Sequence, residues 1–159
     1  MKQAGLIIIL PLLAFPLLGS GLCAQDAVTE DYFQRKTAKK AQQDWTLNCQ
    51  GCHKADGMGR PDKGLPTLTG EVSKFLQVEG GREYLSRVPG VTNASISDSD
   101  LTDLLNWLLR RFDPDNIPQN HMPYSVDEVA QWRKQPLAID AALYRKNLLA
   151  KLAAKNSKN

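Results

Sequence analysis

The sequence contains one Cys-x-x-Cys-His motif, formed by Cys49, Cys52 and His53. This pattern is the attachment signature of a c-type haem. Two cysteines three residues apart project from one helical turn, so both thiols can form thioethers with the vinyl groups on one edge of a porphyrin. The histidine that follows then presents its imidazole to the iron. The motif predicts one covalent haem c attached at Cys49 and Cys52, with His53 as an iron ligand.

Cysteine pairs at this spacing also occur in zinc sites, in disulfides and in thioredoxin-like redox centres. A structural zinc site needs four ligands, and outside the motif the chain has one other cysteine, Cys23, and one other histidine, His121. A thioredoxin-like motif is expected within a βαβ pattern, which the sequence does not show. The haem interpretation is therefore favoured over these alternatives.

Residues 1–24 have the plan of a secretory signal peptide. Lys2 gives a basic start, an apolar run extends over residues 4–18, and small residues precede an expected cleavage after Ala24. The run is short and contains two prolines, so it is a poor candidate for a transmembrane helix. Cys23 raises the alternative of a lipoprotein anchor, but Leu22 is larger than the residue that usually precedes a lipidated cysteine. A cleaved, soluble form is favoured.

Export and haem attachment agree with each other, because covalent c-type haem is assembled outside the cytoplasmic membrane. After cleavage, Cys49 and Cys52 are the only cysteines left in the chain. If both are joined to haem, the exported chain has neither a free thiol nor a structural disulfide in an oxidising compartment. We therefore expect a periplasmic location.

The charge balance does not indicate a nucleic-acid partner. The formal net charge of +3 falls to +2 when Lys2 is removed with the signal peptide, which is a weak excess. Basic residues cluster at positions 36–40 and 145–158. Such clusters can steer an acidic redox partner, and solvated helical faces are the simpler explanation of them.

The hydrophobic pattern predicts one all-α domain, since 159 residues are enough for one compact core. A helix is expected over residues 29–48, with Thr29 as a possible N-cap. Its apolar stripe is expected to consist of Phe33, Thr37, Ala41 and Trp45. Residues 54–70 are too rich in glycine and proline for regular structure, and residues 72–78 and 82–88 are candidates for short helices.

The clearest helix is expected over residues 97–112. Ser97 and Asp100 have the spacing of a capping box, a leucine-rich face follows, and Asp113 precedes the proline that ends the helix. A loop over residues 113–125 leads to a second capping-box pattern, Ser125 with Glu128, which starts a short helix. A last helix is expected over residues 139–155. Its apolar positions are Ala141, Tyr144, Leu148 and Leu152.

The haem motif, residues 56–59 (Asp-Gly-Met-Gly) and residues 64–68 (Gly-Leu-Pro-Thr-Leu) together resemble the class I c-type cytochromes. The resemblance is to small bacterial cytochromes that serve periplasmic dehydrogenases, and it covers roughly residues 30–112. It implies an all-α domain around one covalent haem. It also implies that the Pro66 carbonyl accepts the imidazole N–H of His53 and that Leu68 packs on the same side of the haem. Ordinary loop and core roles are the alternative for these two residues.

The second axial ligand is where the sequence departs from that family. A Met-Pro loop usually precedes the leucine-rich helix, but the residues before residue 97 contain no nearby methionine. Met58 lies too close to the attachment turn to reach the opposite haem face easily. Met122 is followed by proline in an extended loop and is the leading candidate, with His121 beside it as a rival. An open position is the third alternative.

These observations predict a signal peptide over residues 1–24 and a cytochrome domain over residues 25–159, divided into a haem-binding core (25–112) and a helical extension (113–159). We expect a monohaem electron carrier, and not an enzyme, that exchanges electrons with a periplasmic redox protein such as a dehydrogenase or a terminal oxidase. One alternative is a haem subunit of a larger oxidoreductase, docked through the extension. Another is an open-site haem protein with peroxide or gas-ligand chemistry.

We expect the protein to be either a monomer or an enzyme-associated subunit. The extension is longer than a minimal cytochrome needs, so it is either a docking surface or a structural cover over the domain. Exposure of Trp132 and Tyr144 would favour docking, whereas burial of both would favour the structural cover.

Overall fold

The fold is described by a computed structural model over residues 22–157, and these residues form helices and no strand. The α-helices are α1 (Leu22–Asn48), α2 (Gln50–His53), α3 (Gly81–Arg87), α4 (Pro89–Thr92), α5 (Asp98–Phe112), α6 (Val126–Arg133) and α7 (Ala141–Asn156). The 3-10 helices are η1 (Pro61–Lys63), η2 (Val72–Gln77), η3 (Pro114–Asn116) and η4 (Ala138–Asp140). The all-α fold class is confirmed. Most of the expected signal peptide, residues 1–21, lies outside the described residues.

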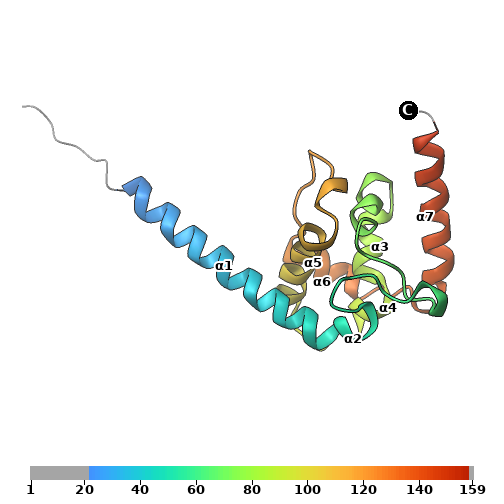
Figure 1. The fold of residues 1–159 in the computed structure, drawn as a ribbon, viewed down its shortest axis with the longest axis horizontal. Helices are drawn as coiled ribbons and strands as arrows, with labels where there is room; N and C mark the ends of the chain where they lie inside the picture. The colour runs from blue at the N-terminus through green and yellow to red at the C-terminus, as the bar shows by residue number, and fades with distance from the viewer. Residues whose placement is uncertain (1–21, 158–159) are drawn as a thin grey trace, which may run out of the picture.

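Helix α1 is longer than predicted. It already runs at Leu22, whereas Thr29 was expected to cap its start. The residues between these two positions include alanine, glutamine and valine but neither glycine nor proline, so nothing ends a helix there. Figure 1 shows α1 extending well beyond the body of the protein. None of the helices in residues 22–157 has both the length and the apolar character to cross a membrane.

The last turns of α1 pack on α5, and this contact decides which part of the predicted stripe is buried. Ala41 and Trp45 are buried, whereas Thr37 is exposed because that turn lies before the contact. The Phe33 side chain lies outside the described residues. Lys40 joins the two helices, since its Nζ lies 2.8 Å from Asp44 and 3.2 Å from Asp100 of α5. This lysine of the N-terminal basic cluster is therefore paired within the chain.

Helix α5 is the centre of the core, and its limits agree with the sequence prediction. The Ser97 hydroxyl accepts a hydrogen bond from the Asp100 backbone N–H, and Asp113 follows the last residue of the helix. The apolar face is buried as expected; its members are Leu101, Leu104, Leu105, Leu108, Leu109 and Phe112. The capping box of α6 is also present, with the Ser125 hydroxyl and the Glu128 carboxylate satisfying each other's backbone N–H groups.

The C-terminal extension covers the domain. Leu148 and Leu152 of α7 are buried in the same core as α5, and α7 packs on α3 and η2. Tyr144 is half-buried, stacks on Tyr84 with ring centroids 5.9 Å apart, and donates its hydroxyl to Glu83 at 2.6 Å. Trp132 is also half-buried and contacts the Tyr124 ring edge-on at 6.3 Å. Both side chains thus lie between the exposure expected of a docking surface and the burial expected of a structural cover.

The C-terminal basic cluster is partly used inside the fold. Lys151 donates to the Glu79 carbonyl at 3.1 Å, and Lys155 donates to the Gln77 carbonyl at 2.9 Å. The Arg145 guanidinium lies 5.7 Å from the centroid of the Phe75 ring. These side chains attach α7 to the segment around η2, so a structural role accounts for them without a partner.

Candidate haem-binding site

The Cys-x-x-Cys-His motif continues helix α1 by one turn. The Cys49 N–H donates to the Trp45 carbonyl at 2.9 Å, and the His53 N–H donates to the Cys49 carbonyl at 3.0 Å. Both thiols are free, with Cys49 half-buried and Cys52 exposed. Burial, with the nearby Asp44 and Cys52 adding to it, raises the pKa of the Cys49 thiol to about 11. The backbone bond from His53 to Cys49 places the two thiols on one helical turn, as thioether attachment to a single porphyrin edge requires.

The imidazole of His53 is oriented by the Pro66 carbonyl, whose oxygen lies 3.2 Å from Nδ1. A carbonyl oxygen can only accept, so Nδ1 carries the proton and Nε2 keeps a free lone pair. Burial lowers the pKa of His53, and the bond to Pro66 opposes this shift. The side chain is thus favoured in the neutral form that ligates metals. The contact itself is the one implied by the family resemblance.

The loop after His53 folds back onto it. The Gly59 N–H donates to the His53 carbonyl at 2.9 Å, and the Leu68 N–H donates to the Gly57 carbonyl at 2.8 Å. Leu68 is half-buried and packs against the core. A side chain at Gly59 would begin 2.5 Å from the Pro66 carbonyl oxygen, and the residue has φ +61°. Glycine is therefore required where this loop passes behind the carbonyl that orients His53.

Aromatic side chains connect the motif to the core. The Trp45 ring lies 6.1 Å from the His53 ring, 4.6 Å from Phe112 and 6.3 Å from Trp107, measured between centroids. Trp45 is 3 % exposed, and the sequence analysis had assigned it only to the apolar stripe of a helix. Its contacts to His53 depend on the packing of α1 against α5, which no local pattern in the sequence encodes.

These residues fit a covalently attached haem. The donor set consists of two free thiols on one turn and a neutral imidazole with an available Nε2, backed by apolar and aromatic side chains. Cys49, Cys52, His53, Pro66 and Leu68 are thus brought together, in the arrangement that the family resemblance implies. Their roles toward the haem stay predictions.

The two candidates for the second axial ligand in the 113–125 loop lie in a different contact network. Met122 is 75 % exposed, and both His121 and Met122 line a pocket of about 460 Å³ together with Arg82 and Glu128. None of the hydrogen bonds or ring contacts found in residues 22–157 joins His121 or Met122 to the haem motif. No sequence pattern indicated Arg82, which bonds the backbone of this segment although it lies about forty residues earlier in the chain.

Two curated proteins are similar to this chain. Two relatives named "Cytochrome c-552", both from Thermus thermophilus, are 28% identical to the chain. One aligns over 156 residues, which is 87% of this chain and 95% of the relative, and the other over 119 residues, which is 64% of this chain and 90% of the relative. These matches support a c-type cytochrome. No family model and no solved structure matches the chain.

The cytochrome assignment agrees with both the fold and the site. The helical architecture of residues 22–157 is consistent with a class I cytochrome c. Because the first relative aligns over 87% of this chain, the similarity extends beyond the haem motif into the C-terminal extension. The names of the relatives support electron transfer by a haem protein.

Proposed function

We propose that this cytochrome carries single electrons in the periplasm on one haem c, attached through Cys49 and Cys52 and ligated by His53. The observation that carries the proposal is a single helical turn with two free thiols, which ends at the imidazole of His53. Nδ1 of this imidazole is bonded to the Pro66 carbonyl. The haem, when bound, supplies an iron that alternates between two oxidation states. The chain supplies attachment, orientation and a low-polarity surrounding.

The residues of the site act on the haem through three physical effects. The thioethers to Cys49 and Cys52 would hold the haem covalently, so its retention would not depend on non-covalent binding affinity. The bond between His53 and Pro66 fixes the ring orientation and increases electron donation from Nε2. Trp45 and Phe112 exclude water from the inner side of the site, since both are almost fully buried. Little rearrangement is then needed when the iron changes its charge.

The exposed end of the motif supports transfer at the protein surface. Cys52 is exposed, and so is Leu47, which has 81 % of its surface accessible one turn earlier. A haem joined to Cys52 would have one edge close to solvent, where a redox partner can approach. We propose a periplasmic dehydrogenase or a terminal oxidase system as that partner, on the basis of the family resemblance.

The test is haem retention and redox cycling of the full chain expressed with haem-attachment machinery. In the parent protein the haem should survive acid–acetone extraction and should be reduced and reoxidised reversibly in a one-electron titration. The double variant Cys49→Ala with Cys52→Ala should lose its haem on extraction. Gly51→Ala is the matched control, because it lies in the same turn and a Cβ there meets nothing within 4 Å. Haem retention by the double variant would disprove covalent attachment.

A further inference from the structure

The segment that carries His121 and Met122 is held by the guanidinium of Arg82. NH1 of Arg82 donates to the Met122 carbonyl at 2.7 Å, and NH2 donates to the Pro123 carbonyl at 2.9 Å. NH1 also lies 3.5 Å from Nδ1 of His121. The main chain at Met122 and Pro123 is thus attached to α3. A shift of the main chain at Met122 would first have to break these charge-assisted hydrogen bonds.

Arg82 is itself fixed on three sides. Its Nε and NH2 donate to the two carboxylate oxygens of Glu128 at 3.0 and 2.9 Å, which is a bidentate pair. Its guanidinium lies 4.3 Å from the centroid of the Tyr124 ring, and the Tyr124 hydroxyl donates to the Arg82 carbonyl at 2.7 Å. The Asn106 side chain bonds the backbone N–H and carbonyl of Tyr124. The segment is therefore part of the packed fold.

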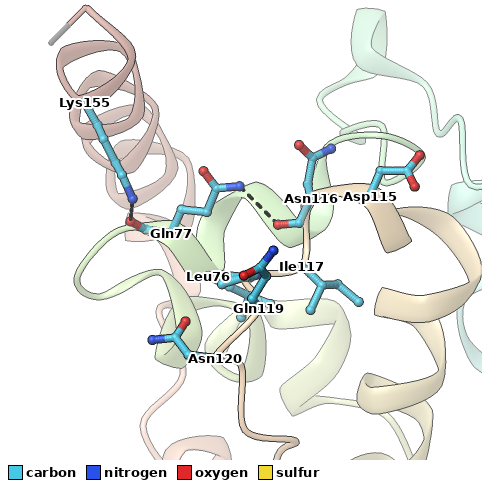
Figure 2. Close-up of a pocket in the computed structure, with 9 residues that line it drawn as sticks. Leu76, Gln77, Asp115, Asn116, Ile117, Gln119, Asn120 and Lys155 are labelled. Carbon is cyan, nitrogen blue, oxygen red and sulfur yellow. Dashed lines mark hydrogen bonds between the residues drawn. The ribbon is translucent and has the colours of Figure 1, made fainter. Parts of the chain in front are cut away.

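The segment that carries His121 and Met122 borders a pocket next to α7. Figure 2 shows this pocket, with Lys155 of α7 against Gln77 and with Gln119 of the loop near Leu76. The pocket that contains Met122 shares Leu76, Pro118 and Asn120 with that site. None of the residues that line the pocket of His121 and Met122 belongs to the Cys49–His53 motif.

Met58 lies in the loop that folds back onto His53. Its N–H donates to the Asp56 carboxylate at 3.0 Å, and its carbonyl accepts from the Thr67 hydroxyl at 3.0 Å. The next residue, Gly59, is bonded to the His53 carbonyl. This loop closes behind His53 through Pro66, so Met58 is attached to the half of the site that holds the first ligand.

The segment between α3 and α5 has no strong iron ligand and is held in place. Residues 88–97 contain no methionine, histidine, cysteine or lysine. Arg133 of the extension donates to the carbonyls of Thr92, Ala94 and Ile96, and its NH1 also bonds Asp98 at 2.9 Å. The extension therefore braces the part of the chain in which the family resemblance would place a methionine.

From these contacts we infer that residues 22–157 provide no second axial ligand, and that the sixth position of the haem iron takes water or a small neutral ligand such as carbon monoxide. The inference rests on the proposed haem attachment at Cys49 and Cys52. Of the alternatives that the sequence left, Met122, His121 and an open position, it selects the open position. It also gives the cytochrome a ligand-binding property that a carrier with two protein ligands lacks.

The experiment compares optical spectra of the haem-loaded full chain with those of three variants, Met122→Ala, His121→Ala and Met58→Ala. The oxidised parent should be high-spin without a sulfur-to-iron charge-transfer band, and the reduced parent should bind carbon monoxide promptly. All three variants should reproduce the parent's spectrum and its carbon monoxide affinity. Met58→Ala is the matched control, since it removes an exposed methionine from the His53 side.

Two results would overturn the inference. One is a low-spin parent whose charge-transfer or carbon monoxide behaviour changes in Met122→Ala or His121→Ala, because that residue would then be a ligand. The other is a low-spin parent that all three substitutions leave unchanged, because another side chain would then fill the position. Loss of covalent haem from the parent would overturn the proposed function together with the inference, whereas a low-spin spectrum on attached haem overturns the inference alone.

Discussion

The carbonyl oxygen of Pro66 lies 3.2 Å from Nδ1 of His53, and Gly59 passes directly behind that carbonyl. The relationship connects a loop glycine to the histidine that we propose as an iron ligand. Gly59 adopts φ +61°, and an ideal Cβ at this position would lie 2.5 Å from the Pro66 carbonyl oxygen. Any side chain there must therefore displace the carbonyl. The geometry of this loop is thus part of the haem site.

We predict that Gly59→Ala raises the reduction potential of the haem. Displacement of the Pro66 carbonyl weakens the hydrogen bond to His53, so Nε2 donates less charge and the oxidised iron is stabilised less. The left-handed backbone adds a stability loss of about 1 kcal/mol. Redox titration and denaturant unfolding measure the two effects separately.

Gly64→Ala is the control for this prediction. Gly64 has φ +76°, but a Cβ there meets nothing within 4 Å. It should lose a similar stability of about 1 kcal/mol from the left-handed backbone while its reduction potential stays that of the parent. An equal change of potential in both variants would show that the effect does not come from the Pro66 carbonyl.

A second prediction concerns the extension. Leu148 is 1 % exposed and belongs to the core around α5, so Leu148→Ala should lower the free energy of unfolding by about 2–5 kcal/mol. Leu143 lies on the same helix but is 60 % exposed, so Leu143→Ala should change it by no more than about 0.5 kcal/mol. Urea denaturation of the haem-loaded chain measures both. Similar small losses would mean that α7 is not part of the cooperative core.

The sequence predicted the local features well because their causes are local. The capping residues Ser97 and Ser125, and the end of α5 before Pro114, depend on side chains within one turn of the helix end. The contact between His53 and Pro66 followed from family resemblance. The start of α1 was predicted wrongly, because Thr29 is only a permissive cap and the preceding residues also favour a helix.

The parts that could not be predicted depend on contacts between distant residues. Arg82 reaches Glu128, and Arg133 reaches the backbone of residues 92–96; in each case about forty residues separate the partners. A single sequence contains no periodicity that pairs an arginine with a carbonyl so far away. The position of His121 and Met122 depends on the contact between Arg82 and Glu128. From the sequence alone, the two residues could be compared as iron ligands only by the residues next to them in the chain.

A third prediction concerns the buried carboxylate of Asp113, which is 1 % exposed. Its Oδ2 accepts the Ser73 backbone N–H at 2.7 Å, and its Oδ1 accepts from the Asn116 amide at 2.6 Å. Asp113→Ala leaves the Ser73 N–H buried without a partner, so the free energy of unfolding should fall by about 1–3 kcal/mol. Asp115→Ala, at an exposed position two residues on, should change it by no more than about 0.5 kcal/mol. Thermal unfolding followed by circular dichroism compares the two, and equal losses would contradict a specific role for Asp113.

The fourth prediction is an acid-dependent loss of stability through Glu128. Hydrogen bonds from the Arg82 guanidinium hold the pKa of Glu128 at about 2, below its ordinary 4.5, and outweigh the opposing effect of burial. The folded state therefore keeps the carboxylate ionised where the unfolded state binds a proton. The stabilisation is complete above pH 4.5 and is lost as the pH falls from there through about 2. Allowing for solvent screening, it should amount to about 1–2 kcal/mol.

The variant Glu128→Gln tests this linkage when its unfolding free energy is measured as a function of pH. The difference from the parent should be full at pH 6, should shrink below pH 4.5, and should be small at pH 2, where Glu128 of the parent is partly protonated as well. Asp127→Asn removes the same charge from the same turn of α6 without touching the ion pair with Arg82. Its difference from the parent should stay small throughout this range. A Glu128→Gln difference that does not change between pH 6 and pH 2 would show that the Arg82–Glu128 pair does not stabilise the fold through its charge.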